Sequence, residues 1–81
     1  TNYPNPFSDK TIISFTLPRH ENVTILIHDF AGRLVERLFD GILEDGTHSI
    51  TFSPKALRPG TYQCTVHAGP LLRSRSLLLV R

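Results

Sequence analysis

Apolar and polar residues alternate with a period of two along most of this chain. The alternation is clear in the stretches 11–18, 22–30, 46–52 and 60–69. Such a pattern predicts strands that each bury one face and leave the other in water. The positions that share the buried phase are Ile13, Phe15, Leu17, Val23, Ile25, Ile27, His48, Ile50, Phe52, Tyr62, Cys64 and Val66.

Two stretches are less regular. In 33–41 the apolar residues recur at i, i+1, i+4 and i+5, a spacing that also fits a helix of one or two turns. So short a helix is marginal by itself, and strands flank it, so we predict a strand with an irregularity. The connector 53–60 carries prolines near both ends, with room for one helical turn at 55–57.

The last stretch, 71–81, begins polar and ends in the apolar run 77–80. This pattern is typical of a strand that is buried on both faces or covered by a partner. Alternate leucines can also face opposite ways, which would make some of them ordinary core. Both interpretations stay open at the level of sequence.

Six or seven short strands separated by Gly, Pro, Asp and Asn turns predict an all-β fold, an immunoglobulin-like antiparallel β-sandwich of about seven short strands. A length of 81 residues predicts one domain over 1–81, opened by an extended, proline-rich lead-in at 1–10. Within the lead-in, Tyr3 and Phe7 bracket two prolines. We expect these aromatics to lie across one end of the sandwich, or else to dock in a partner groove.

Composition narrows the possible functions. The net charge of +2 is too small an excess to indicate nucleic-acid binding. Arg73 and Arg75 share one face of a strand, which indicates either a solvated face or a basic docking patch. Cys64 is alone, so an internal disulfide is excluded, and we expect it to be buried. No apolar run approaches the ~20 residues of a membrane-spanning helix.

Candidate chemistry is sparse. The histidines at 20, 28, 48 and 67 lack the spacing of a metal site, and there is no cysteine pair. The serines have no G-x-S-x-G context, and no glycine-rich phosphate loop is present. We therefore expect no catalytic, metal or cofactor site, and a domain that is not an enzyme.

Three motifs resemble a known family. The opening NYPNPF at 2–7 is similar to the first signature of type IX secretion C-terminal sorting domains, and of related flagellar hook-capping-type immunoglobulin-like domains. VTILIHDFAGRLVERL at 23–38 resembles the family's V-x-L-x-V-x-D-x-x-G-R-x-V-x-x-L stretch, and LRPGTY at 57–62 its L-x-x-G-x-Y segment. The motif positions are Tyr3, Pro4, Asn5, Pro6, Phe7, Asp29, Gly32, Gly60 and Tyr62.

The resemblance implies a non-catalytic sorting module of a larger secreted bacterial protein, which passes through the periplasm to the medium or the cell surface. It implies recognition by an outer-membrane translocon, removal by a sortase-like peptidase, an N-terminal cargo domain, and Arg81 as the parent's C-terminus. The last strand is the expected docking element, since it could add to a receptor's sheet edge. The candidate docking residues are Arg73, Arg75, Leu77, Leu78, Leu79, Val80 and Arg81.

Two other functions fit the composition. One is a structural immunoglobulin-like spacer or assembly module beside a catalytic domain. The other is a carbohydrate-binding accessory module, which needs a row of exposed aromatics. With 5 Phe and 2 Tyr, mostly in the predicted core phase, such a row is hard to assemble.

Overall fold

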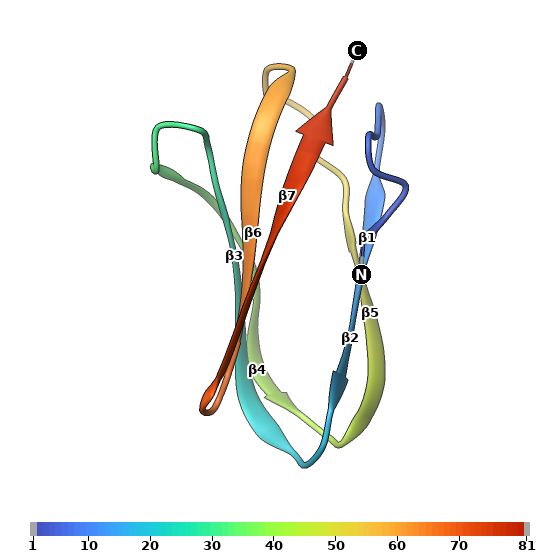
Figure 1. Ribbon diagram of the computed structural model, residues 1–81, viewed down its shortest axis with the longest axis vertical. Coiled ribbons are helices and arrows are strands. Elements are labelled where there is room, and N and C mark those ends of the chain that lie inside the picture. The colour runs from blue at the N-terminus through green and yellow to red at the C-terminus, as the bar shows by residue number, and fades with distance from the viewer. Residues whose placement is uncertain (1, 81) are drawn as a thin grey trace.

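Two antiparallel sheets pack face to face in this chain (Figure 1). The computed structural model describes residues 2–80, with side chains from Pro4 onward. The smaller sheet has the order β1-β2-β5 and consists of β1 (Asn2–Tyr3), β2 (Thr11–Leu17) and β5 (Gly46–Phe52). The larger has the order β4-β3-β6-β7 and consists of β3 (Glu21–His28), β4 (Leu34–Leu43), β6 (Gly60–Ala68) and β7 (Leu71–Leu79). The predicted all-β antiparallel sandwich is confirmed.

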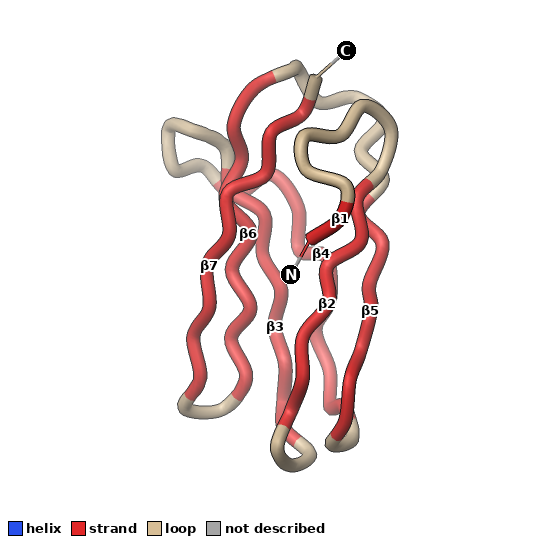
Figure 2. Tube along the Cα trace, turned by 45° about the vertical axis from the view of Figure 1, so that its right-hand side comes forward, coloured by secondary structure: helices blue, strands red, loops and turns tan. Residues whose placement is uncertain are grey.

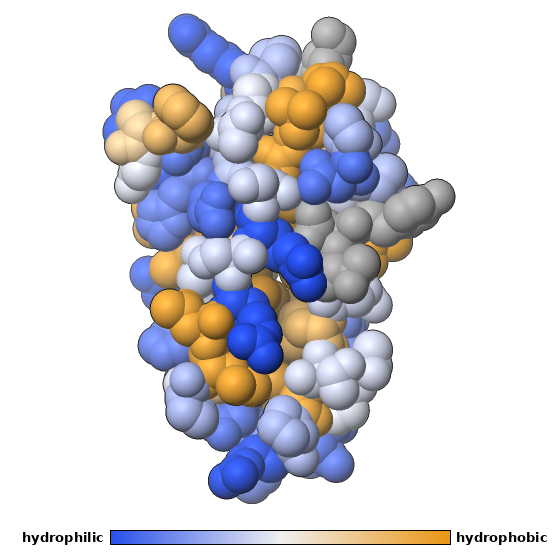
Figure 3. Space-filling view, in the orientation of Figure 1, coloured by the Kyte–Doolittle hydropathy of each residue, from blue (hydrophilic) through white to orange (hydrophobic). Residues whose placement is uncertain are grey.

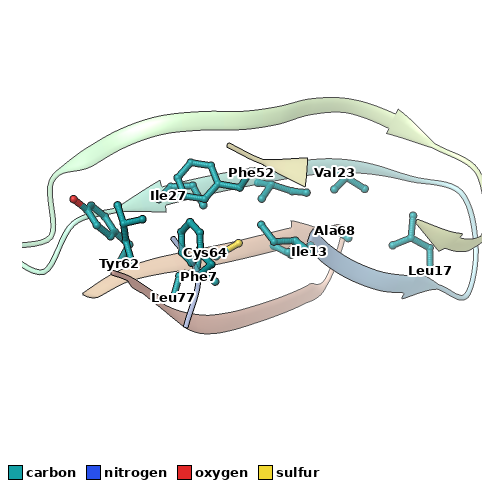
Figure 4. Close-up of a cluster of buried hydrophobic side chains, with 13 residues drawn as sticks. Phe7, Ile13, Leu17, Val23, Ile27, Phe52, Tyr62, Cys64, Ala68 and Leu77 are labelled. Atoms are coloured by element: carbon teal, nitrogen blue, oxygen red, sulfur yellow. The ribbon is translucent and has the colours of Figure 1, made fainter. Parts of the chain in front are cut away.

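Side chains from every second strand position point into the space between the sheets and form the core (Figure 4). On β3, for example, Val23, Ile25 and Ile27 have no exposed surface. The buried apolar residues are Phe7, Ile13, Leu17, Val23, Ile25, Ile27, Phe52, Tyr62, Cys64, Val66, Ala68, Leu77 and Leu79. Burial of these side chains is the main force that holds the two layers together.

Three positions of the predicted core phase are only partly buried, namely Phe15, His48 and Ile50. Phe15 lies opposite His48 in the β2–β5 pair, and their rings stack with centroids 5.7 Å apart. Phe15 also lines an open groove rather than the closed interior. Phe15 therefore points toward the other sheet, as predicted. It stays partly exposed because the groove beside it is open to solvent.

The irregular stretch forms β4 and contains two register shifts against β3. Ile25 lies opposite Phe39 and Leu26 opposite Arg37, so Leu38 is an extra residue in the ladder. A second shift leaves Val35 without an opposite residue. Each extra residue changes which face the following side chains take, and this produces the helix-like spacing of the apolar positions.

The connector between β5 and β6 contains no helix, so the expected turn of helix at 55–57 is wrong. Pro54 is buried and Leu57 is partly buried, so the segment packs against the core as an irregular loop. The hydroxyl of Tyr62 donates a hydrogen bond to the carbonyl of Arg58 at 2.6 Å. A tyrosine at the start of a strand, bonded to the backbone just upstream, is the tyrosine corner of immunoglobulin-type sandwiches.

The lead-in is part of the sandwich rather than a segment that precedes it. Asn2 and Tyr3 form β1, paired with Ile13 and Ile12 of β2. The peptide bond between Asn5 and Pro6 is cis. Figure 2 shows the lead-in looping over the end of the molecule where the last strand finishes.

Candidate docking surface on the last strand

β7 is the edge strand of the larger sheet, with β6 as its partner. The β6–β7 hairpin turns at Gly69 and Pro70, and Ala68 lies opposite Leu71. In a two-residue hairpin the closing pair is hydrogen-bonded, and bonded pairs then alternate along the ladder. The odd-numbered residues of β7 therefore bond to β6, and the even-numbered ones direct their N–H and C=O groups away from the sheet.

The lead-in already occupies the C-terminal half of this outer edge. The N–H of Phe7 donates to the carbonyl of Leu78 at 2.9 Å, and the N–H of Val80 donates to the carbonyl of Phe7 at 2.8 Å. The side chain of Asn5 accepts from the N–H of Leu78 at 2.9 Å and donates to the carbonyl of Ser76 at 2.8 Å. A receptor strand could not pair with this edge unless it displaced the lead-in, which corrects the expected mode of docking.

The two faces of β7 divide the terminal leucines. Leu77 and Leu79 are 0% and 1% exposed and belong to the core. Leu78 and Val80 are 40% and 42% exposed and face outward. The interpretation as ordinary core therefore holds for Leu77 and Leu79, whereas coverage of Leu78 and Val80 by a partner stays a prediction. Arg81, which the sequence also suggested as a docking residue, lies outside the described residues.

Arg73 and Arg75 lie in the same phase as Leu77 and Leu79, so they are on the inner face of β7. Their side chains are nevertheless exposed, because they border an open groove rather than the closed core. They line the groove between β2 and β7, away from the outward face that carries Leu78. The structure thus places the arginine pair on the opposite face from Leu78 and Val80, the exposed apolar candidates. This groove was not predicted, since alternation along one strand does not show whether the facing sheet reaches it.

The D-x-x-G-R motif builds a rigid turn between β3 and β4. Oδ1 of Asp29 accepts hydrogen bonds from the N–H groups of Ala31 and Arg33 at 3.0 and 2.9 Å, and Oδ2 accepts from Nε of Arg33 at 3.0 Å. The hydrogen bond from the backbone N–H of Arg33 makes the largest contribution to lowering the pKa of the Asp29 carboxyl. Gly32 has φ +89°, a conformation that side chains disfavour. The motif is accounted for by the turn alone.

The remaining motif residues are structural as well. Gly60 begins β6 with φ +150°, which favours glycine, and Tyr62 forms the tyrosine corner. Phe7 is 2% exposed, and its ring centroid lies 6.1 Å from that of Phe52. Pro4 and Pro6 are exposed. The side chain of Tyr3 lies outside the described residues, so the expectation that it covers the sandwich end stays a prediction.

Within the described residues, no group of three or more His, Cys, Asp or Glu residues could hold a metal ion. Cys64 is buried, and desolvation raises the pKa of its thiol to about 11, which makes it a poor nucleophile. Nε2 of His48 donates to the carbonyl of Glu44 at 2.7 Å, a structural contact. In the part of the chain that the structure describes, no helix has the length and apolarity to span a membrane.

Comparison with known proteins agrees with the motifs. Residues 1–79 match the family described as the secretion system C-terminal sorting domain. No curated protein and no solved structure gave a significant match, so the relation to flagellar hook-capping-type domains stays a prediction. With nearly its whole length matched, this chain belongs to the secretion system C-terminal sorting domains, the sorting signals of type IX secretion that mark proteins for the cell surface or for release.

Proposed function

We propose that residues 1–81 are a single, non-catalytic sorting domain that the outer-membrane translocon recognises by its folded surface. The observation that carries this proposal is the outward pair Leu78 and Val80 on an ordered terminal strand. Apolar side chains this exposed contribute binding energy when a partner covers them. Because the strand is already fixed by two neighbours, a receptor would bind it with little further loss of chain entropy.

The docking surface joins the family's opening motif to the last strand. Asn5 and Phe7 from the opening signature hold the backbone of Leu78 and Val80. A receptor that contacts this surface would therefore read the start and the end of the domain together. Only the folded domain presents such a surface, because the opening motif and the last strand lie at opposite ends of the sequence.

We further propose that the domain carries an N-terminal cargo domain and is removed by a sortase-like peptidase when the cargo is attached to the cell surface. Residues 2–7 are built into the sandwich through β1 and the Phe7 bridge. A cut on the N-terminal side of Asn2 would leave these contacts intact, so the released domain would stay folded. Cleavage within 2–7 would separate β1 from the rest of the lead-in.

The other functions considered from sequence receive less support. A sugar-binding face needs several aromatic rings side by side in solvent. Among the side chains that the structure describes, Phe7, Phe52 and Tyr62 are buried, and Phe30 is an isolated exposed ring at 89%. A spacer would not need Leu78 or Val80 to be apolar, whereas the proposed docking surface does. Substitution of these two residues therefore distinguishes the two functions.

The test uses a reporter fused to residues 1–81 in a bacterium with type IX secretion. Leu78→Glu/Val80→Glu should abolish export, because it places two charges on the docking surface. Leu34→Glu/Ile42→Glu is the matched control, since these side chains are 50% and 70% exposed on β4, at the far edge of the larger sheet. Far-UV circular dichroism of the purified domains would establish that each variant is folded. Undiminished export of the folded double variant would reject this docking surface.

A further inference from the structure

The seam between β2 and β7 is open along part of its length. A groove of about 430 Å³ lies there, between the end of β2 and the beginning of β7. Ile13, Leu17, Val66 and Ala68 give it an apolar floor, and all four are buried residues of the core. In Figure 3, strongly hydrophilic side chains lie along β7 beside exposed apolar surface.

Both strands that flank the groove have an unpaired edge. β1 pairs with β2 at Ile12 and Ile13, and in the described residues no strand continues along 15–17. On β7 the bonds from the lead-in reach as far as Ser76. Among the described residues, no partner is present for the outward backbone groups of Leu72 and Ser74. Two such edges on either side of an apolar floor have the shape that an added strand requires.

Toward the C-terminal end of β7, the lead-in already closes the same seam. There the lead-in runs extended beside β7, bonds to its backbone, and inserts Phe7 into the core. An extended segment with apolar side chains pointing inward is thus the solution that this fold already uses. The open part offers the same combination of a free edge and an apolar floor.

Charge restricts what can enter. Arg73 and Arg75 stand at the groove on the inner face of β7, and within residues 2–80 the ion pairs involve Arg33 and Arg37 instead. A charged side chain on the inner face of an edge strand opposes indiscriminate strand addition. A second copy of this chain, if added through β7, would bring arginine against arginine. A strand with carboxylates would instead neutralise both guanidinium groups.

We propose that this groove accepts an extended, acidic strand from a partner protein. Apolar side chains of the strand fill the groove, its backbone bonds to the free edges of β2 and β7, and its carboxylates pair with Arg73 and Arg75. The site goes beyond recognition of the sorting signal and is separate from the outward face of Leu78 and Val80.

The test measures binding of capped peptides to the 81-residue chain by calorimetry at low salt. In one peptide valine alternates with glutamate, and in the other valine alternates with lysine. We expect the glutamate peptide to bind at least about tenfold more tightly. Arg73→Glu/Arg75→Glu should reverse this preference, whereas the control Lys55→Glu/Arg58→Glu, with the same change in net charge, should retain it.

Hydrogen exchange of the unmodified chain gives a second readout that does not depend on the variants. The glutamate peptide should slow exchange at the amides of Leu72 and Ser74. Equal affinity for the two peptides, no binding of either, an unchanged preference in the reversed variant, or protection confined to other strands would overturn the proposal. These measurements do not involve export, so a negative result would not count against the docking surface at Leu78. Likewise, a negative export result would not count against this groove.

Discussion

Oδ1 of Asn5 accepts a hydrogen bond from the N–H of Leu78 at 2.9 Å, although 73 positions separate the two residues. The Nδ2 group of the same side chain donates to the carbonyl of Ser76 at 2.8 Å. One amide side chain thereby supplies the donor and the acceptor that a neighbouring strand residue would offer. Asparagine and glutamine alone carry both groups in an amide, which explains why an asparagine suits this place between two prolines.

The first prediction concerns this contact. Asn5→Ala should lower the free energy of unfolding by about 1–2 kcal/mol, because it removes two hydrogen bonds from the edge of β7. Urea titration measures the loss, and exchange of the Leu78 amide should become faster. Asn22→Ala, at an exposed position of β3, is the control. If both variants unfold at the same urea concentration as the parent chain, the lead-in does not hold the last strand.

A second prediction compares two phenylalanines. Phe7→Ala should cost about 3–5 kcal/mol, since it empties a space in the core beside Phe52. Phe30→Ala should change stability by no more than about 0.5 kcal/mol, because that ring is 89% exposed on the β3–β4 turn. Thermal or chemical unfolding measures both. Equal effects would show that Phe7 is not part of the core.

The buried thiol provides a third prediction. Burial raises the pKa of Cys64 from its ordinary 9.0 to about 11, so the thiol stays neutral in the folded chain where the unfolded chain ionises. Stability should therefore be unaffected below about pH 9 and should fall as the pH rises from there toward 11. Thiol-specific labelling near neutral pH should be far slower for the folded chain than in urea. Equally fast labelling would mean that Cys64 is accessible.

The turn at Asp29 supports a fourth prediction. The N–H of Arg33, followed in smaller measure by its side chain, holds the pKa of the Asp29 carboxyl below its ordinary value of 3.8. The charged carboxylate therefore stabilises the fold above this value, and the contribution disappears as the pH falls through the lowered pKa. Asp29→Asn should be less stable than the parent near neutral pH and nearly equal to it in strong acid. A difference that stays constant with pH would contradict this account.

The sequence was sufficient to predict the sandwich, because alternation reports directly which side chains face inward. It also indicated the irregular strand, although the two extra residues at Val35 and Leu38 appear only when β4 is aligned with β3. The helical turn at 55–57 was wrong because Pro54 and Leu57 pack against the core in an irregular loop. The spacing of apolar residues along a segment does not show how that segment packs against the rest of the fold.

Less of the candidate site could be predicted from the sequence. Alternation leaves open whether a terminal leucine is core or surface until the strand has a partner sheet. The bond from Asn5 to Leu78 joins opposite ends of the chain and depends on a side-chain amide, which no periodic pattern encodes. The groove beside Arg73 depends on where the smaller sheet ends, and this is a property of two strands together.

Export of a reporter tests the central claim most directly. Residues 1–81 would be fused to the C-terminus of a periplasmic reporter enzyme in a bacterium with type IX secretion, and reporter activity would be measured in the periplasm, on the cell surface and in the medium. Our account predicts activity outside the cell for the intact domain and retention in the periplasm for Ile27→Asp, which places a charge in the core. Retention of the reporter while the intact domain is demonstrably folded would contradict it.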